Sequence, residues 1–245
     1  MSRTLYGMPV ANLDARISAY VQVWEQRVKA GPRPLDKLPF VTLSRQFGCQ
    51  ALPLGSRLAE ILNERLRPAR PWAAYDREVL DRVAQELNLR REIVESLDNR
   101  RRDEMSELFD AVMNRKMDEA VMYRKMAEVI RSLATLGHAV LLGRGSYLLT
   151  QDLKNGLHVR LVAPLEWRIQ NFATIHNLPL TGAKKIVEQG QKERDTFLRT
   201  IFVQNPAHPV LHDLAFDCSR FSVPQLAEVI FTALEARFGE ALITD

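Results

Sequence analysis

The sequence predicts an α/β fold in which a parallel β-sheet is covered by helices on both faces. Short apolar stretches typical of strands recur along the chain, among them 139–142, 157–164 and 211–219. Segments with apolar residues at helical spacing separate these stretches. Two of the stretches run into a glycine turn and then a helix. Because parallel strands are joined by helical crossovers that cover the sheet, this alternation predicts a parallel sheet with both faces buried.

Composition is that of an ordinary globular protein. The chain has 245 residues, enough for one large or two small domains, with 46% hydrophobic and 26% charged residues. The net charge of +4 fits an anionic small ligand or weak attraction to nucleic acid. One dense basic run, "NRRRD" at 99–103, is interpreted as a solvated helix start or loop.

Cysteine and histidine spacing predicts neither a disulfide framework nor a metal site. The two cysteines lie far apart, at 49 and 218, and the five histidines show no ligand spacing. No apolar stretch approaches the roughly 18 residues of a membrane helix, and the first 30 residues lack the apolar region of a signal peptide. We therefore expect a cytoplasmic protein that does not contact a membrane.

An N-terminal extension precedes the main domain. Apolar residues form a helical stripe over 11–29, and "GPRP" at 31–34 ends the helix. The stripe packs on the main body or, alternatively, contacts a partner subunit in a homo-oligomer. We expect residues 1–37 to form this extension and linker, and residues 38–245 to form one domain.

The main domain opens with an apolar strand from residue 41, a turn at Gly48 and an amphipathic helix over 54–62. A short strand ending near Asp76 follows, with helical runs to about residue 97. Further on we expect a helical pattern at 104–136, a strand at 139–142 with the turn "GRG", a strand at 157–164, helices at 165–176 and 181–202, a last strand at 211–219 and a closing helix at 223–238.

Several separated motifs together resemble the cytidylate kinase-like family of P-loop nucleoside monophosphate kinases. They are "SRQFGC" after the first strand, "YDRE" some thirty residues on, "GRG", "VRLVAPLEWRI", "KERDTFLR" and "HDLAFDCSRFSVPQLAEVI". The resemblance covers roughly 38–238. It implies a central parallel sheet with helical acceptor-binding and lid segments. It also implies ATP as phosphoryl donor, Mg²⁺, and a nucleoside monophosphate such as CMP as acceptor.

The phosphate loop departs from the standard pattern GxxxxGK[ST], in which lysine contacts the β- and γ-phosphates and a hydroxyl binds Mg²⁺. The lysine position falls at Ala51, followed by Leu52 and Pro53. Relatives often read like "GSGGRE" here, so the missing lysine is partly a family trait. In this sequence, however, Gln50 and Ala51 stand at the two later glycine positions. We expect a narrowed or reshaped loop.

Phosphate binding is nevertheless expected at the loop, through Gly48, Cys49, Gln50 and Ala51, because backbone N–H groups and the helix N-terminus converge there. Arg45 could supply the missing positive charge. The alternative, that Arg45 is a surface arginine at the end of the strand, fits the sequence equally well.

The acceptor site is expected at the same sheet edge. By resemblance, Asp76 and Arg77 would face the acceptor nucleotide, although an N-cap aspartate beside a solvent-exposed arginine is an alternative. Arg144 follows an apolar strand between two glycines, so its guanidinium could bind phosphate or a base edge.

The resemblance makes Lys192, Arg194 and Arg199 the cations of a lid that closes over the transferring phosphoryl group. Lys192 and Arg199 share a helix face, whereas Arg194 projects roughly 160° away from Lys192. A solvated helix, with acidic neighbours pairing these cations, is the alternative.

Three functions remain open from the sequence. The first is an active nucleoside monophosphate kinase with an altered loop. The second is a binding module of kinase fold that acts as a sensor or partner-binding subunit and turns nucleotide over poorly or not at all. The third, nucleic-acid binding through 99–103, is the weakest because no aromatic residues interleave with those charges.

Overall fold

A computed structural model describes the chain over 4–5, 8–9, 38–80, 117–202 and 212–242. The expected helix at 11–29 and the basic run at 99–103 lie outside these residues, as does the first part of the helical pattern at 104–136. Residues 4–5 and 8–9 form a small antiparallel pair, β1 (Thr4–Leu5) and β2 (Met8–Pro9), which the sequence pattern did not predict.

The core of the domain is a five-stranded sheet in which every neighbouring pair is parallel. Its strand order is β4-β5-β3-β6-β7. The strands are β3 (Phe40–Arg45), β4 (Ala73–Tyr75), β5 (Ala139–Leu142), β6 (Gly156–Val162) and β7 (Leu214–Asp217). The predicted parallel sheet is confirmed. The first strand, β3, lies at its centre, so the loop that follows β3 has a neighbouring strand end on either side.

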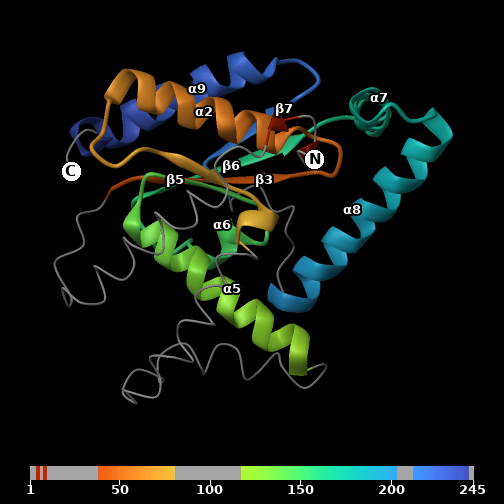
Figure 1. Ribbon diagram of the computed structural model, residues 1–245, viewed down its shortest axis with the longest axis horizontal. Helices are drawn as coiled ribbons and strands as arrows, with labels where there is room; N and C mark the ends of the chain where they lie inside the picture. Colours follow the sequence, from red (N-terminus) through yellow and green to blue (C-terminus); the bar gives the residue numbers. More distant parts are fainter. Residues whose placement is uncertain (1–3, 6–7, 10–37, 81–116, 203–211, 243–245) are drawn as a thin grey trace.

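Helices cover both faces of the sheet, as predicted (Figure 1). One face packs against α2 (Ala51–Leu66) and α9 (Val223–Phe238), and the other against α5 (Met117–Leu136) and the short α6 (Ser146–Leu149). Side-chain alternation along β3 divides the core: Val41 and Leu43 join the cluster under α2 and α9, while Phe40 joins the cluster under α5.

Two further helices extend from the carboxyl end of β6. They are α7 (Leu165–His176) and the long α8 (Leu180–Phe202), which runs along one side of the domain (Figure 1). The expected boundaries of these helices and of α9 agree with the structure to within a residue. The last strand is shorter than the expected 211–219. A 3₁₀ turn, η2 (Gly239–Leu242), ends the described chain. In the described ranges, no helix is long and apolar enough to cross a membrane.

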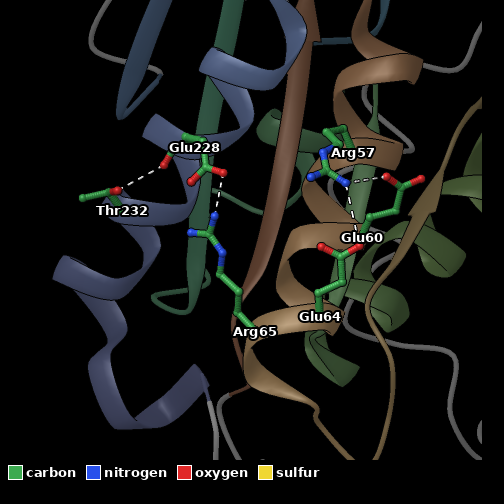
Figure 2. A network of polar contacts seen from close by, with 6 residues as sticks. All are labelled: Arg57, Glu60, Glu64, Arg65, Glu228 and Thr232. Atoms are coloured by element: carbon green, nitrogen blue, oxygen red, sulfur yellow. Dashed lines mark hydrogen bonds and ion pairs between the residues drawn. The ribbon is translucent and has the colours of Figure 1, made fainter.

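The packing of α2 against α9 depends mainly on buried apolar residues, and a polar network lies on its surface (Figure 2). Arg65 of α2 forms an ion pair with Glu228 of α9 at 2.6 Å, and its guanidinium lies 4.7 Å from the centre of the Phe231 ring. Arg57 pairs with Glu60 within α2. The Arg65 and Glu228 side chains are 46% and 47% exposed, so this pair is expected to contribute at most about 1 kcal/mol.

We predict that Ser222→Ala lowers the free energy of unfolding by about 1 kcal/mol. Ser222 caps α9: its hydroxyl accepts from the N–H of Gln225, whose side chain accepts from the N–H of Ser222. Thr232→Ala is the matched control, because it removes an exposed hydroxyl from the middle of the same helix. Urea unfolding measures both. Equal effects of the two substitutions would contradict a specific role for the cap.

Candidate functional site

The candidate site begins at the loop between β3 and α2. Gly48 has a φ of +96°, and a Cβ atom placed on it would lie 2.8 Å from the Cβ atom of Arg168. Both the left-handed backbone and the close approach of α7 therefore require glycine at this position. The expected strand, glycine turn and helix are all present.

Hydrogen bonds attach the loop to the end of β6. The N–H of Gln46 donates to the carbonyl oxygen of Leu161 at 2.9 Å, and the Gln46 side-chain oxygen accepts from the N–H of Ala163 at 2.9 Å. The path of the loop is therefore fixed on its β6 side by a glutamine that the sequence motifs did not mark as functional.

Two side chains of α7, those of Arg168 and Asn171, form hydrogen bonds with the loop. Arg168 is buried, with 7% of its surface exposed, and donates to the carbonyl oxygens of Phe47 and Ala163, each at 3.0 Å. Asn171 donates to the carbonyl oxygen of Gly48 at 2.8 Å and accepts from the Gln50 side chain at 2.8 Å. We did not predict either residue. Their spacing of three on a helix places them on one face, which is the only sign of this role in the sequence.

Among the described residues, the N-terminus of α2 has free backbone N–H groups, as an anion-binding site does, but it lacks the lysine of a standard phosphate loop. Ala51, at the lysine position, is 1% exposed, and its N–H donates to the Cys49 carbonyl oxygen at 3.1 Å. Gln50 precedes the helix without a side-chain capping bond. Within the described part of the chain, the N–H groups of Gly48 and Gln50 have no hydrogen-bond acceptor, and they lie beside the positive end of the helix.

Helix α8 packs directly on the loop. The Phe47 ring lies against Gly190, where an added Cβ atom would come within 2.5 Å of the ring, and the Phe47 N–H donates to the Gln191 side-chain oxygen at 2.8 Å. One turn later, Arg194 donates to the Arg45 carbonyl oxygen at 2.8 Å. The segment that the sequence suggested as a lid therefore contacts both backbone atoms and the Phe47 side chain of the loop after β3.

Of the three lid cations, only Arg194 faces the loop. Lys192 and Arg199 are exposed, as their shared helix face suggested. The guanidinium of Arg194 is enclosed, lying 5.8 Å from the centre of the Phe47 ring. Burial lowers the pKa of Arg194 to about 9, and the charges of Arg45 and Arg160 act in the same direction. Three guanidinium groups therefore lie close enough to influence one another.

Arg160 is a site residue that the sequence analysis missed. It lies in β6, in register with Ser44 of β3, and among the residues described neither it nor Arg194 forms an ion pair with a carboxylate. Arg160 is the one charged residue within the apolar stretch "LHVRLVAP". A charged residue inside a central strand was the available sign, because such strands are normally apolar throughout.

Arg45 extends along the sheet edge to the turn that carries Arg144. The Nη1 atom of Arg45 lies 3.5 Å from the place a Cβ atom would take on Gly143. Arg144 has a φ of +54°. Its carbonyl oxygen accepts from the Tyr123 hydroxyl at 3.3 Å, and its guanidinium lies 5.9 Å from the centre of the Phe197 ring. Helices α5 and α8 therefore both contact Arg144.

Asp76 and Arg77 follow β4 at this same edge. Asp76 accepts a hydrogen bond from the N–H of Val79 at 3.0 Å, so it caps the helical turn after the strand, and Arg77 is exposed. Strands β3, β4 and β5 are parallel. Gly48, Asp76 and Arg144 follow their carboxyl ends, as expected.

A histidine completes the surroundings of Arg160. The His212 Nε2 atom lies 2.7 Å from the Ser44 hydroxyl, and the His212 ring packs on the Tyr147 ring with centroids 4.4 Å apart. Burial, followed by the charge of Arg160, lowers the pKa of His212 to about 4. His212 is therefore neutral at pH 7 and leaves the positive charge to the arginines.

A five-stranded parallel sheet covered by helices on both faces, with a glycine turn and a helix after its central strand, is an α/β domain of kinase type. The model of the cytidylate kinase-like family matches residues 40–220, which is well over half of the chain. The chain belongs to the cytidylate kinase-like family. No curated protein matches it.

Solved structures share the fold at low sequence identity. A crystal structure described as an uncharacterized protein from Eubacterium ventriosum aligns with a TM-score of 0.61 and 15% identity, covering 81% of this chain and 99% of that one. A shikimate kinase from Bacteroides thetaiotaomicron aligns with a TM-score of 0.46 and 14% identity, covering 80% of this chain and 98% of that one. At these identities, the first match supports the fold and no particular activity.

We predict that the folded protein loses stability as the pH falls from 6.5 to 4. The pKa of His212 is 6.5 in the unfolded chain and about 4 in the folded one. The unfolded chain therefore binds more protons in this window, and the loss is complete below pH 4. It amounts to at most about 3 kcal/mol. Burial also lowers the pKa of His158, which adds to the same trend.

His212→Gln should flatten this dependence without removing it, because His158 remains. Urea unfolding at a series of pH values measures the difference between the two proteins. Identical pH profiles for the variant and the original protein would show that His212 does not carry the effect.

Proposed function

We propose that the protein is a nucleoside monophosphate kinase that transfers the γ-phosphoryl group of ATP to a nucleoside monophosphate such as CMP. The observation that carries this proposal is the cluster of Arg45, Arg160 and Arg194 beside the phosphate loop. Arg194 in this cluster is enclosed and forms no ion pair with a carboxylate among the described residues, and enclosed positive charge is costly unless an anion compensates it. Phosphoryl transfer is catalysed mainly by positioning and by neutralising phosphate charge, which such a cluster supplies.

In this proposal, the ATP phosphates bind at the loop residues Gly48, Cys49, Gln50 and Ala51, where backbone N–H groups and the α2 N-terminus meet. Arg45 and Arg160 supply the charge that the missing lysine would carry, and Arg194 contacts the transferring phosphoryl group. Lys192 and Arg199, exposed as α8 now lies, would reach the nucleotide only after movement of α8.

The acceptor monophosphate binds at Asp76, Arg77 and Arg144 in this proposal. All three follow strands that end at the edge where the phosphate loop lies. The guanidinium of Arg144 stacks on Phe197 of α8. A movement of α8 at the donor side would therefore also change the position of Arg144 at the acceptor side.

Magnesium enters the proposal only as the ion that accompanies the ATP phosphates. Leu52 and Pro53 offer no hydroxyl where a standard loop binds Mg²⁺. In the ranges that the structure describes, no three histidine, cysteine or acidic side chains cluster as metal ligands. The described residues therefore do not fit a protein-held Mg²⁺, and we assign the ion no step.

A catalytically weak or inactive nucleotide-binding module is the second candidate. One observation favours it: the N–H of Phe47 is occupied by Gln191 and that of Ala51 by the Cys49 carbonyl oxygen, so fewer loop amides are available to phosphate. Such a module would bind nucleotide as a sensor or as a partner-binding subunit.

A phosphoryl-transfer screen separates the two candidates. The full chain is incubated with ATP and Mg²⁺ and with each of a panel of nucleoside monophosphates, and calorimetry measures binding in parallel. Transfer to any acceptor supports the kinase. Binding without transfer supports the module, and neither binding nor transfer would overturn both.

We predict that Arg160→Ala and Arg45→Ala each weaken the binding of Mg·ATP by about 10- to 100-fold, because a charge-assisted contact to phosphate contributes roughly 1.5 to 3 kcal/mol. The matched control is Arg57→Ala, an exposed arginine of α2 paired with Glu60. Calorimetry measures the affinities. If the site variants bind Mg·ATP as tightly as the control, backbone amides alone account for phosphate recognition.

Arg144→Ala should weaken monophosphate binding by a similar factor while leaving the affinity for Mg·ATP within about threefold, because its turn follows a different strand from the phosphate loop. Titration with CMP and with ATP in separate experiments tests this difference. An unchanged affinity for the monophosphate would return Arg144 to a structural role in the turn.

A further inference from the structure

The only two cysteines of the chain, 169 residues apart (218 − 49), lie together in the folded protein. Cys49 belongs to the phosphate loop and Cys218 directly follows β7. Both are buried in one core cluster, 6% and 8% exposed, and each thiol shifts the pKa of the other. Their positions in the sequence do not indicate that they form a pair.

Backbone hydrogen bonds to a single strand fix this proximity. The N–H of Cys218 donates to the Val162 carbonyl oxygen at 2.8 Å, and the N–H of Gln46, three residues before Cys49, donates to the Leu161 carbonyl oxygen at 2.9 Å. Both segments are therefore attached to the end of β6. The thiol pair consequently follows from the sheet topology.

The two thiols differ in character. The neighbouring Cys218 thiol, acting as a donor toward Cys49, lowers the pKa of Cys49; burial opposes this, and the positive charge of Arg168 adds to the lowering. The neighbouring Cys49 thiol, together with burial, raises the pKa of Cys218. Cys49 is therefore the thiol that ionises and Cys218 the one that keeps its proton.

Arg168 supports the same assignment through geometry. Its guanidinium is buried and donates to the carbonyl oxygens of Phe47 and Ala163. Over the described part of the chain, no carboxylate forms an ion pair with it. A buried guanidinium needs a counter-charge, which a Cys49 thiolate can provide.

We propose that Cys49 and Cys218 form a reversible disulfide when the protein meets a peroxide. The Cys49 thiolate attacks one oxygen of hydrogen peroxide, so an S–O bond forms, the O–O bond breaks, and the departing hydroxide takes up a proton to give water. The Cys218 sulfur then attacks the resulting sulfenic acid. The S–S bond forms, the S–O bond breaks, and hydroxide leaves as water with the Cys218 proton.

In this exchange the two thiols are oxidised and one peroxide is reduced to two waters. The product links the phosphate loop covalently to the residue after β7, across the end of β6. The inference does not depend on the proposed kinase activity, since it concerns the thiols themselves.

The test uses the full chain, purified reduced and then treated with hydrogen peroxide under native conditions. We expect the thiols titratable in denaturant to fall from two to none and dithiothreitol to restore both. Peptide mapping without reductant should find the segments containing Cys49 and Cys218 linked, with the mass lowered by two hydrogen atoms. Free thiols that persist, Cys49 oxidised to sulfinic acid without a linkage, or linkage only between chains would each overturn the proposal.

Two variants assign the roles. In Cys218→Ser, Cys49 should stop at the sulfenic acid, which dimedone traps. In Cys49→Ser, Cys218 should react about tenfold or more slowly, because burial still raises the pKa of the Cys218 thiol after its partner is removed. Equal reactivity of the two single-cysteine variants would overturn the assigned order of attack. Should either variant fail to fold, peptide mapping of the unmodified chain still decides whether the disulfide forms.

Discussion

The buried guanidinium of Arg168 is the constraint on which the candidate site depends. By donating to the carbonyl oxygens of Phe47 and Ala163, it connects α7 to the loop after β3 and to the end of β6. The same proximity leaves no room for a side chain at Gly48. A guanidinium that donates to carbonyl oxygens and has no carboxylate partner among the described residues also makes the loop a positive environment, in which a Cys49 thiolate and a bound phosphate would both be stabilised.

Helix α8 contacts both the loop after β3 and the turn after β5 at this edge of the sheet. Gly190, Gln191 and Arg194 contact the loop after β3, while Phe197 stacks on Arg144 in the turn after β5. These positions recur at helical spacing on one face of α8. Donor-side and acceptor-side candidates are therefore connected by one helix, and a displacement of α8 would alter both.

The altered loop and the arginine cluster are two parts of one arrangement. The lysine position is taken by buried Ala51, whereas Arg160 introduces a charge from the middle of β6 and Arg194 brings another from α8. The positive charge thus lies on the elements that surround the loop and not at the lysine position of the loop itself. Coulombic attraction depends on distance and burial and not on which segment carries the charge, so this arrangement is compatible with the phosphate binding that we propose.

The sequence by itself determined the order of strands and helices, the boundaries of α7, α8 and α9, and the edge at which Gly48, Asp76 and Arg144 meet. These features follow from local hydrophobic periodicity and from the rule that parallel strands end at one edge. Only the tertiary structure decided that Arg160, Arg168 and Asn171 lie near the loop after β3, that Arg194 faces this loop while Lys192 and Arg199 do not, and that Cys49 lies near Cys218. The reason is physical: these contacts join segments more than a hundred residues apart, and the packing of neighbouring strands and helices sets the distances between them.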